Sequence, residues 1–162
     1  MASQLDFQCL KCGSCCKNII ETINGVQRCL ILTKKETNLF PAEIVTPQYA
    51  IGITKPTRIV FYQMKANPCP YLNAKNECRI YDNRPLICRS FPVMANYISS
   101  KCQAFSCRKP GQVYQDIYPM AKMKEASNKI TLYVAANFGK NLKAGTKEWE
   151  YDLATKKWIS RK

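Results

Sequence analysis

The sequence predicts an α+β fold: a small, irregular, metal-stabilised domain of short helices and hairpins around cysteine-ligated centres, with a C-terminal helix or hairpin extension. Three observations predict it. Ten of the 162 residues are cysteine and none is histidine. Apolar segments are short and separated by Pro, Asn and Gly turns. The length suits one domain with a small appendage. We therefore expect a cysteine-cluster metal-binding domain over 1–111 and a basic extension packed on it over 112–162.

The cysteine content indicates metal or redox chemistry if the protein is cytoplasmic. We expect that location because the sequence has no apolar run near twenty residues and no secretory signal at its start. In a reducing compartment, many cysteines indicate metal or redox sites more often than disulfides. Structural disulfides, as in intracellular proteins of hyperthermophiles, are the alternative.

Composition also excludes several classes of function. Without histidine there is no Ser-His-Asp or Cys-His pair and no histidine-containing zinc site. Six scattered glycines build neither a Walker loop nor a GxGxxG turn. The formal charge is +14, and residues 1–107 and 108–162 each carry +7. This charge is either a solvated basic surface or a surface for an acidic partner, such as RNA or an anionic protein.

The first third of the chain predicts a strand, a short helix and a second strand. An Asn24-Gly25 turn leads into a strand over 25–32. Thr33 and Glu36 form a capping box that begins a helix, which must end near Pro41. Residues 42–56 are expected to be loop, and 57–64 has strong strand propensity.

The remaining elements are predicted from shorter patterns. Segments 69–72 and 78–81 flank a polar, Asn-containing link and suggest a hairpin. One or two helical turns follow over 86–91. Pro119 can open a helix, although Lys129–Val134 would serve equally as a strand. Alternation over 148–153 and 157–160 predicts a terminal hairpin. Its aromatic residues are expected to pack the face of the hairpin, and a base-stacking platform is the alternative: Trp149, Tyr151 and Trp158.

The first cysteine stretch predicts a metal site. Cys9-x2-Cys12 followed by Gly13 has the geometry of a thiolate knuckle, in which glycine allows the tight turn. Continuing to Cys15 gives the spacing of bacterial ferredoxins, whose fourth ligand is a Cys-Pro that Cys69 could supply. The spacing occurs in zinc and iron–sulfur sites alike.

The adjacent pair Cys15-Cys16 suggests more than one centre, because consecutive side chains normally diverge. Eight cysteines are therefore the predicted ligands, without an assignment to groups: Cys9, Cys12, Cys15, Cys16, Cys69, Cys78, Cys88 and Cys107. Cys29 lies in a predicted strand and is expected to be a buried small hydrophobe. Cys102 is either a spare thiol or a ligand.

The complete pattern resembles the YkgJ-type "CxxCxxCC" cysteine-cluster family. The resemblance runs from residue 7 to about residue 111 and rests on Phe7-x-Cys9-x2-Cys12-Gly13-x-Cys15-Cys16, Cys69-Pro70-Tyr71-Leu72, Cys78-x-Ile80-Tyr81-x2-Arg84-Pro85-x2-Cys88-Arg89-x-Phe91-Pro92 and a late Cys107. It implies a zinc- or iron-chelating protein, often labelled an iron–sulfur oxidoreductase and related to flagellin lysine methylases. The usual late Cys-Pro-Gly is replaced here by Cys107-Arg108-Lys109-Pro110-Gly111.

Two arginines flank Cys88 and are the predicted cofactor-binding side chains. Arg84 and Arg89 could donate hydrogen bonds to thiolates or cluster sulfides, which would raise the potential of the centre. The alternative is an ion pair between Arg84 and Asp82 or Glu77.

Three functions follow from these observations. The first is an iron–sulfur protein, with a [4Fe-4S] cluster, that transfers electrons or handles clusters with a redox or acidic protein partner. The second is a zinc-stabilised basic module that binds RNA or a ribonucleoprotein. The third, lysine methylation, rests on family kinship alone.

Overall fold

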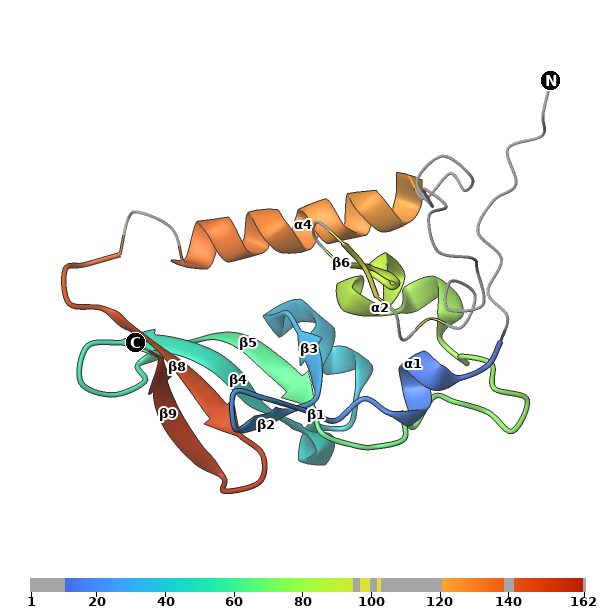
Figure 1. The fold of residues 1–162 in the computed structure, drawn as a ribbon, viewed down its shortest axis with the longest axis horizontal. Coiled ribbons are helices and arrows are strands. Elements are labelled where there is room, and N and C mark those ends of the chain that lie inside the picture. The colour runs from blue at the N-terminus through green and yellow to red at the C-terminus, as the bar shows by residue number, and fades with distance from the viewer. Residues whose placement is uncertain (1–10, 95–96, 100–101, 103–120, 139–141, 162) are drawn as a thin grey trace. The chain divides into compact units, whose positions relative to one another are not determined.

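The computed structural model describes residues 11–94, 97–99, 102, 121–138 and 142–161, and their elements are drawn in Figure 1. They combine short helices with antiparallel sheets, so the predicted α+β class is confirmed. The chain forms two compact units, each built from separate segments. One unit comprises residues 1–17 and 71–132, and the other comprises 18–70 and 133–162. The predicted boundary near 111 lies outside the described residues and stays a prediction.

The unit formed by 18–70 and 133–162 is built on an antiparallel sheet. Its five strands are ordered β3-β5-β4-β8-β9, and a separate hairpin pairs β1 with β2. The strands are β1 (Glu21–Ile23), β2 (Val26–Arg28), β3 (Leu30–Leu32), β4 (Val45–Gly52), β5 (Arg58–Met64), β8 (Lys147–Asp152) and β9 (Lys157–Arg161). The 3-10 helices η1 (Lys34–Leu39) and η2 (Ala42–Ile44) lie between β3 and β4 in the sequence.

The predicted terminal hairpin is confirmed, and it forms part of this sheet. β8 pairs with β9 and also with β4, where Ala50 lies opposite Trp149. The core of the unit contains Ile51, Val60 and Phe61. The Tyr133 ring, from the helix α4 (Ala121–Phe138), packs on Phe61 with 4.8 Å between centroids. The last segment of the chain therefore completes a sheet that the early strands begin.

Strand β4 corrects the expectation that 42–56 is a loop. Pro47 misled the prediction because proline cannot donate a ladder hydrogen bond. In the structure, Pro47 lies opposite Tyr62 of β5, whereas pairing with β8 begins only at Tyr49. The ladder with β5 is irregular around Tyr49. The proline is thus accommodated in the part of β4 that precedes its pairing with β8.

Two other local predictions are confirmed with changes of detail. The Thr33–Glu36 capping box is present, and the Thr33 amide donates to the Glu36 carboxylate at 2.8 Å. The helix it begins is a 3-10 helix that stops before Pro41. The predicted strand over 25–32 is interrupted at Cys29, whose amide donates to the buried Gln63 side chain at 2.9 Å.

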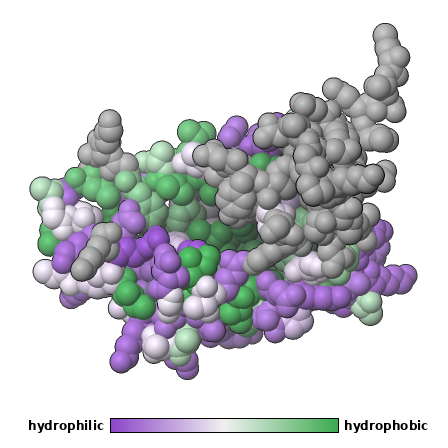
Figure 2. Space-filling view, viewed as in Figure 1, coloured by the Kyte–Doolittle hydropathy of each residue, from purple (hydrophilic) through white to green (hydrophobic). Residues whose placement is uncertain are grey.

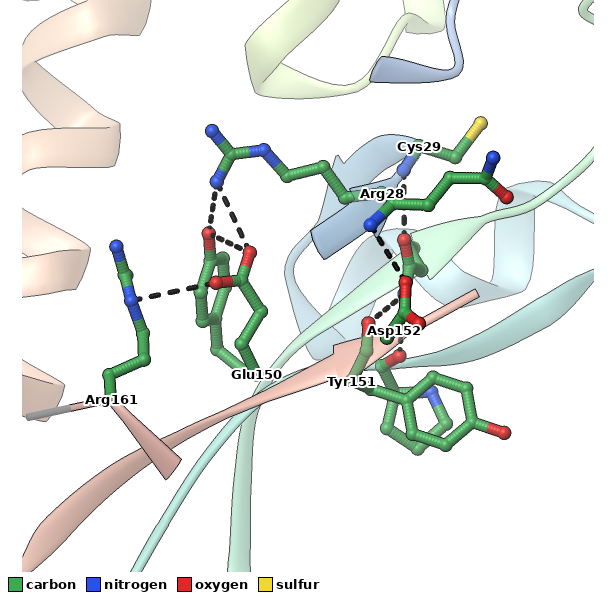
Figure 3. Close-up of polar contacts among 10 residues, drawn as sticks. Arg28, Cys29, Glu150, Tyr151, Asp152 and Arg161 are labelled. Carbon is green, nitrogen blue, oxygen red and sulfur yellow. Dashed lines mark hydrogen bonds and ion pairs between the residues drawn. The ribbon is translucent and has the colours of Figure 1, made fainter. Parts of the chain in front are cut away.

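Two buried carboxylates of β8 hold the ends of this unit together (Figure 3). The Glu150 side chain is 5% exposed and is approached by the guanidinium groups of Arg28 at 3.3 Å and Arg161 at 3.5 Å. The Tyr49 hydroxyl also donates to Glu150 at 2.8 Å. Asp152 accepts from the Gln27 amide of β2 at 2.7 Å. Charged side chains are buried here because each is paired or hydrogen-bonded.

The unit formed by 1–17 and 71–132 has shorter elements. They are α1 (Ser14–Lys17), η3 (Tyr81–Asn83), α2 (Leu86–Ser90), the paired strands β6 (Val93–Met94) and β7 (Tyr97–Ile98), and the start of α4 (Ala121–Phe138). The predicted turns over 86–91 are confirmed as α2. The open choice at 129–134 is resolved in favour of helix. On α4, Ala126 and Ser127 are buried, whereas Val134 is 39% exposed.

Hydrophobic surface (green) alternates with hydrophilic surface (purple) over the face drawn in Figure 2. The most exposed large apolar side chain of the described residues is Leu132 of α4, at 68%. None of the helices in the described part of the chain has both the length and the apolar character needed to cross a membrane.

We expect Asp152→Asn to destabilise the protein, since Asp152 caps the β8–β9 turn and binds β2. The Thr155 hydroxyl and the Gln27 amide hold the pKa of Asp152 below its usual value. Its contribution to stability is therefore complete above the unfolded pKa of about 3.9 and is lost as pH falls through the lower folded value. The loss in melting temperature should thus be constant near neutral pH and shrink in acid. Glu148→Gln, at an exposed position of the same strand, is the control and should change little.

Candidate metal centre

The first cysteines lie on a tight turn. Gly13 has φ +73°, the left-handed conformation that glycine adopts readily. Its carbonyl accepts from the amides of Cys16 and Lys17, each at 2.9 Å, and α1 carries Cys15 and Cys16. The Cys12 sulfur lies 3.4 Å from the Ser14 hydroxyl. The predicted role of Gly13 in turning the backbone is confirmed.

This turn packs against a second turn that is distant in the sequence. Lys11 Nζ lies 2.8 Å from Glu77 Oε1. A Cβ placed on Gly13 would come within 3.1 Å of Asn76 Oδ1. The unit therefore brings the Cys12–Cys16 segment to the arm that carries Cys78.

The second turn is built by Asn73. Its side-chain oxygen accepts from the amides of Lys75 and Glu77, both at 2.9 Å. Beyond the turn, Leu72 and Cys78 form a single antiparallel bridge, so the predicted hairpin over 69–81 is reduced to this one pair. The supporting roles of Asn73 and Lys11 were not predicted. The signal available was Asn73 in a polar link, because asparagine side chains commonly hydrogen-bond the backbone of their own turn.

Cys15 and Cys16 do not diverge as expected. Their sulfurs lie 3.9 Å apart at the end of the glycine turn. Two thiolates on one tetrahedral zinc, with Zn–S near 2.3 Å, are separated by about 3.8 Å. The contact with Cys16 is the main cause that lowers the pKa of Cys15 to about 6, and the positive charge of Arg84 contributes. At neutral pH this pair can supply a thiolate, and its separation suits one shared ion.

Arg84 is held beside this pair by Tyr81. Its Nε donates to the Tyr81 carbonyl at 2.8 Å, and its guanidinium carbon lies 3.8 Å from the centroid of the Tyr81 ring. Nη1 also donates to the Cys88 carbonyl at 3.4 Å. Glu77, one of the carboxylates expected as its partner, is instead paired with Lys11. Cation–π contact and backbone hydrogen bonds thus keep the charge of Arg84 near Cys15.

Arg89 lies in the last turn of α2, and its amide donates to the Pro85 carbonyl. Lys129 is the main cause that lowers the pKa of Glu125 on α4, and Arg89 adds to it. The role of Arg89 beside a cysteine-ligated centre stays a prediction.

Cys69 and Cys29 belong to the other unit, where both are buried. Burial raises the pKa of Cys29 to about 11, and the nearby Cys69 adds to the effect. Cys29 is buried as expected of a small hydrophobic side chain. Cys102 is also buried, and its amide donates to the Ser99 carbonyl.

The predicted ligand set is only partly within the described residues. Cys9 and Cys107 lie outside them. Cys12, Cys15, Cys16, Cys78 and Cys88 lie in one unit and Cys69 in the other. Across the described ranges, no three side chains of His, Cys, Asp or Glu gather closely enough to hold a metal ion. The assignment of the eight ligands stays a prediction.

Fold and cysteine pattern together define a small α+β cysteine-cluster protein. The profile of the family "CxxCxxCC: Putative zinc- or iron-chelating domain" matches residues 8–127, most of the chain, and the protein belongs to this family. The resemblance inferred from the motifs is thereby confirmed and extends into α4. No curated protein and no solved structure gave a match.

We expect Gly13→Ala to weaken both folding and metal loading. Gly25→Ala is the matched control, because Gly25 also has a positive φ (+79°) but has open space around its Cβ position. The left-handed backbone alone should cost roughly 1–2 kcal/mol in each variant. Gly13→Ala must in addition displace Asn76 and Lys17. Equal melting temperatures and equal metal content of the two variants would contradict the packing of the cysteine turn on the Asn73–Glu77 turn.

Proposed function

We propose that the protein holds an iron–sulfur cluster, a [4Fe-4S] centre, and serves in electron transfer or cluster handling. The observation that carries this proposal is the ferredoxin-like spacing Cys9-x2-Cys12-x2-Cys15 within a chain of a zinc- or iron-chelating family. A [4Fe-4S] cluster takes four thiolates, and the proposed ligands are drawn, without an assignment to groups, from the eight cysteines predicted from the sequence: Cys9, Cys12, Cys15, Cys16, Cys69, Cys78, Cys88 and Cys107.

The donor set fits a sulfur-ligated centre. Soft thiolates suit zinc and iron–sulfur clusters, and the chain has no histidine to offer instead. The Cys9-x2-Cys12-x2-Cys15 spacing favours the cluster, because bacterial ferredoxins use it. A bound cluster would supply one-electron transfer.

Arg84 supports this role through its charge. A guanidinium held by Tyr81 near Cys15 offsets the negative charge of coordinated thiolates and so raises the reduction potential. Arg89 is proposed to act in the same way from the other side of Cys88 in the sequence.

An electron-transfer role requires a partner. The proposed partner is a redox protein or another protein with an acidic surface, attracted by the formal charge of +14. A reducing compartment, the cytoplasm, would keep the thiols available for metal. In this proposal the metal-binding domain spans 1–111 and the basic extension 112–162.

Two alternatives remain from the sequence. A zinc-stabilised module binding RNA or a ribonucleoprotein uses the same thiolates and the same positive charge. Lysine methylation rests on kinship alone, and the radical pattern Cys-x3-Cys-x2-Cys fails because Cys12 and Cys16 are followed by Ile19 at the required position.

Metal and sulfide analysis tests the proposal. Anaerobically purified protein should be brown and contain iron and acid-labile sulfide, and Cys78→Ser should lose most of both. Cys29→Ser, at a buried thiol outside the proposed set, should retain them. Colourless protein containing only zinc would exclude the cluster and favour the zinc alternative.

Removal of the metal should unfold part of the protein, because the energy of metal binding is folding energy in small cysteine-ligated domains. We expect a chelator to lower the melting temperature and reduce the near-UV circular dichroism. Tyr81, which packs on Arg84, should lose its fixed environment. Unchanged spectra and melting temperature after complete metal removal would show that the thiolates do not support the fold.

A further inference from the structure

Alternation along the C-terminal hairpin separates its side chains by chemistry. Trp149 and Tyr151 of β8 belong to one face of the sheet, and Trp158, directly opposite Tyr151 on β9, belongs to the same face. Lys147, two residues before Trp149, also belongs to it. We call this surface the aromatic face, defined by Trp149, Tyr151, Trp158 and Lys147.

The acidic residues of β8 all belong to the opposite face. Glu148, Glu150 and Asp152 alternate with the aromatic positions, and Glu150 and Asp152 are buried. In Figure 3, Tyr151 extends to the other side of β8 from Glu150. The aromatic face therefore carries rings and positive charge, while the negative charge of the strand is directed away from it.

The rings are held in place and remain partly exposed. Tyr151 and Trp158 pack edge to face, with centroids 5.3 Å apart and planes inclined at 72°. The Trp149 indole N–H donates to the Gly52 carbonyl at 3.1 Å, which fixes the ring over β4. All three side chains are half-buried, so part of each ring is open to solvent.

We propose that the aromatic face binds single-stranded nucleic acid. Fixed aromatic rings provide surfaces on which unpaired bases stack, and neighbouring cationic side chains contact the phosphates. Lys147 lies on the face, and Lys156 follows in the β8–β9 turn, where both are exposed. Charge complementarity with the lysines favours an anionic occupant. The rings favour nucleic acid over an acidic peptide, because the peptide would use the lysines but would not need the rings.

The proposal goes beyond metal binding and does not depend on which metal is held. The family match ends at residue 127, before β8 begins at Lys147. The site is thus carried by a part of the chain outside the matched domain, within the unit that contains the five-stranded sheet.

Binding of full-length protein to a fluorescently labelled single-stranded oligonucleotide, dT or rU, tests the proposal by anisotropy and by quenching of tryptophan fluorescence. We expect binding at low salt that weakens steeply as salt rises. Trp158→Ala should weaken it by about 5- to 150-fold, since stacking contributes about 1–3 kcal/mol per base. Ile159→Ala, the neighbouring residue on the opposite face, should leave the affinity unchanged. A duplex of the same sequence should bind more weakly.

Two further variants keep the test decisive if Trp158→Ala is unstable. Trp158→Phe should preserve the fold and most of the affinity. Lys147→Gln should weaken binding and reduce its salt dependence, whereas Lys157→Gln, on the opposite face, should do neither. Absence of binding by the wild-type protein at low salt would overturn the proposal. Equal losses of affinity in Trp158→Ala and Ile159→Ala would also overturn it. Equal affinities for heparin and for the oligonucleotide, both unchanged by Trp158→Ala, would overturn it as well and would indicate a surface for proteins or polyanions.

Discussion

The buried carboxylates of β8 are the constraint on which the sheet-containing unit depends. Asp152 binds the backbone of β2 through Gln27, and Glu150 is paired with Arg28 of the same strand and with Arg161. Removal of either carboxylate would leave partly buried donors without acceptors, which adds a cost to the lost attraction itself. These contacts connect residues near the beginning of the chain with residues near its end. Alternation along β8 places these acidic side chains on one face of the sheet and the aromatic residues on the other.

Sequence reasoning succeeded where a local signal had a single structural meaning. The Thr33–Glu36 capping box, the Asn24-Gly25 turn and the alternation around Trp149 and Trp158 each predicted the element found. It failed for β4. A strand tolerates a proline such as Pro47 where one of its edges has no paired strand, and here pairing with β8 begins only at Tyr49. It also left α4 undecided, since Lys129–Val134 satisfies helix and strand patterns equally. Tertiary packing decides between such alternatives, and packing contacts cannot be read from a single sequence.

The cysteine pattern identified the family and the glycine turn but not the surroundings of the thiols. The pairing of Lys11 with Glu77 depends on a contact between distant segments, whereas the support of the turn by Asn73 is local and has a signal in the sequence. The approach of the Cys15 and Cys16 sulfurs contradicts the general rule that neighbouring side chains diverge. The close pair changes the expectation for this segment, because it can act as a joint donor to one ion.

Because β4 lies between β5 and β8, the order in which the strands are synthesised affects how the sheet forms. Chains emerge from the ribosome N-terminus first, and domains generally fold as units. The edge of β4 that β8 covers therefore stays open until Lys147–Asp152 has been made, near the end of the chain. Cys12 through Cys102 emerge earlier, so the thiols are available before the sheet is complete. A transcript truncated before β8 would produce a protein with an open, aggregation-prone strand edge.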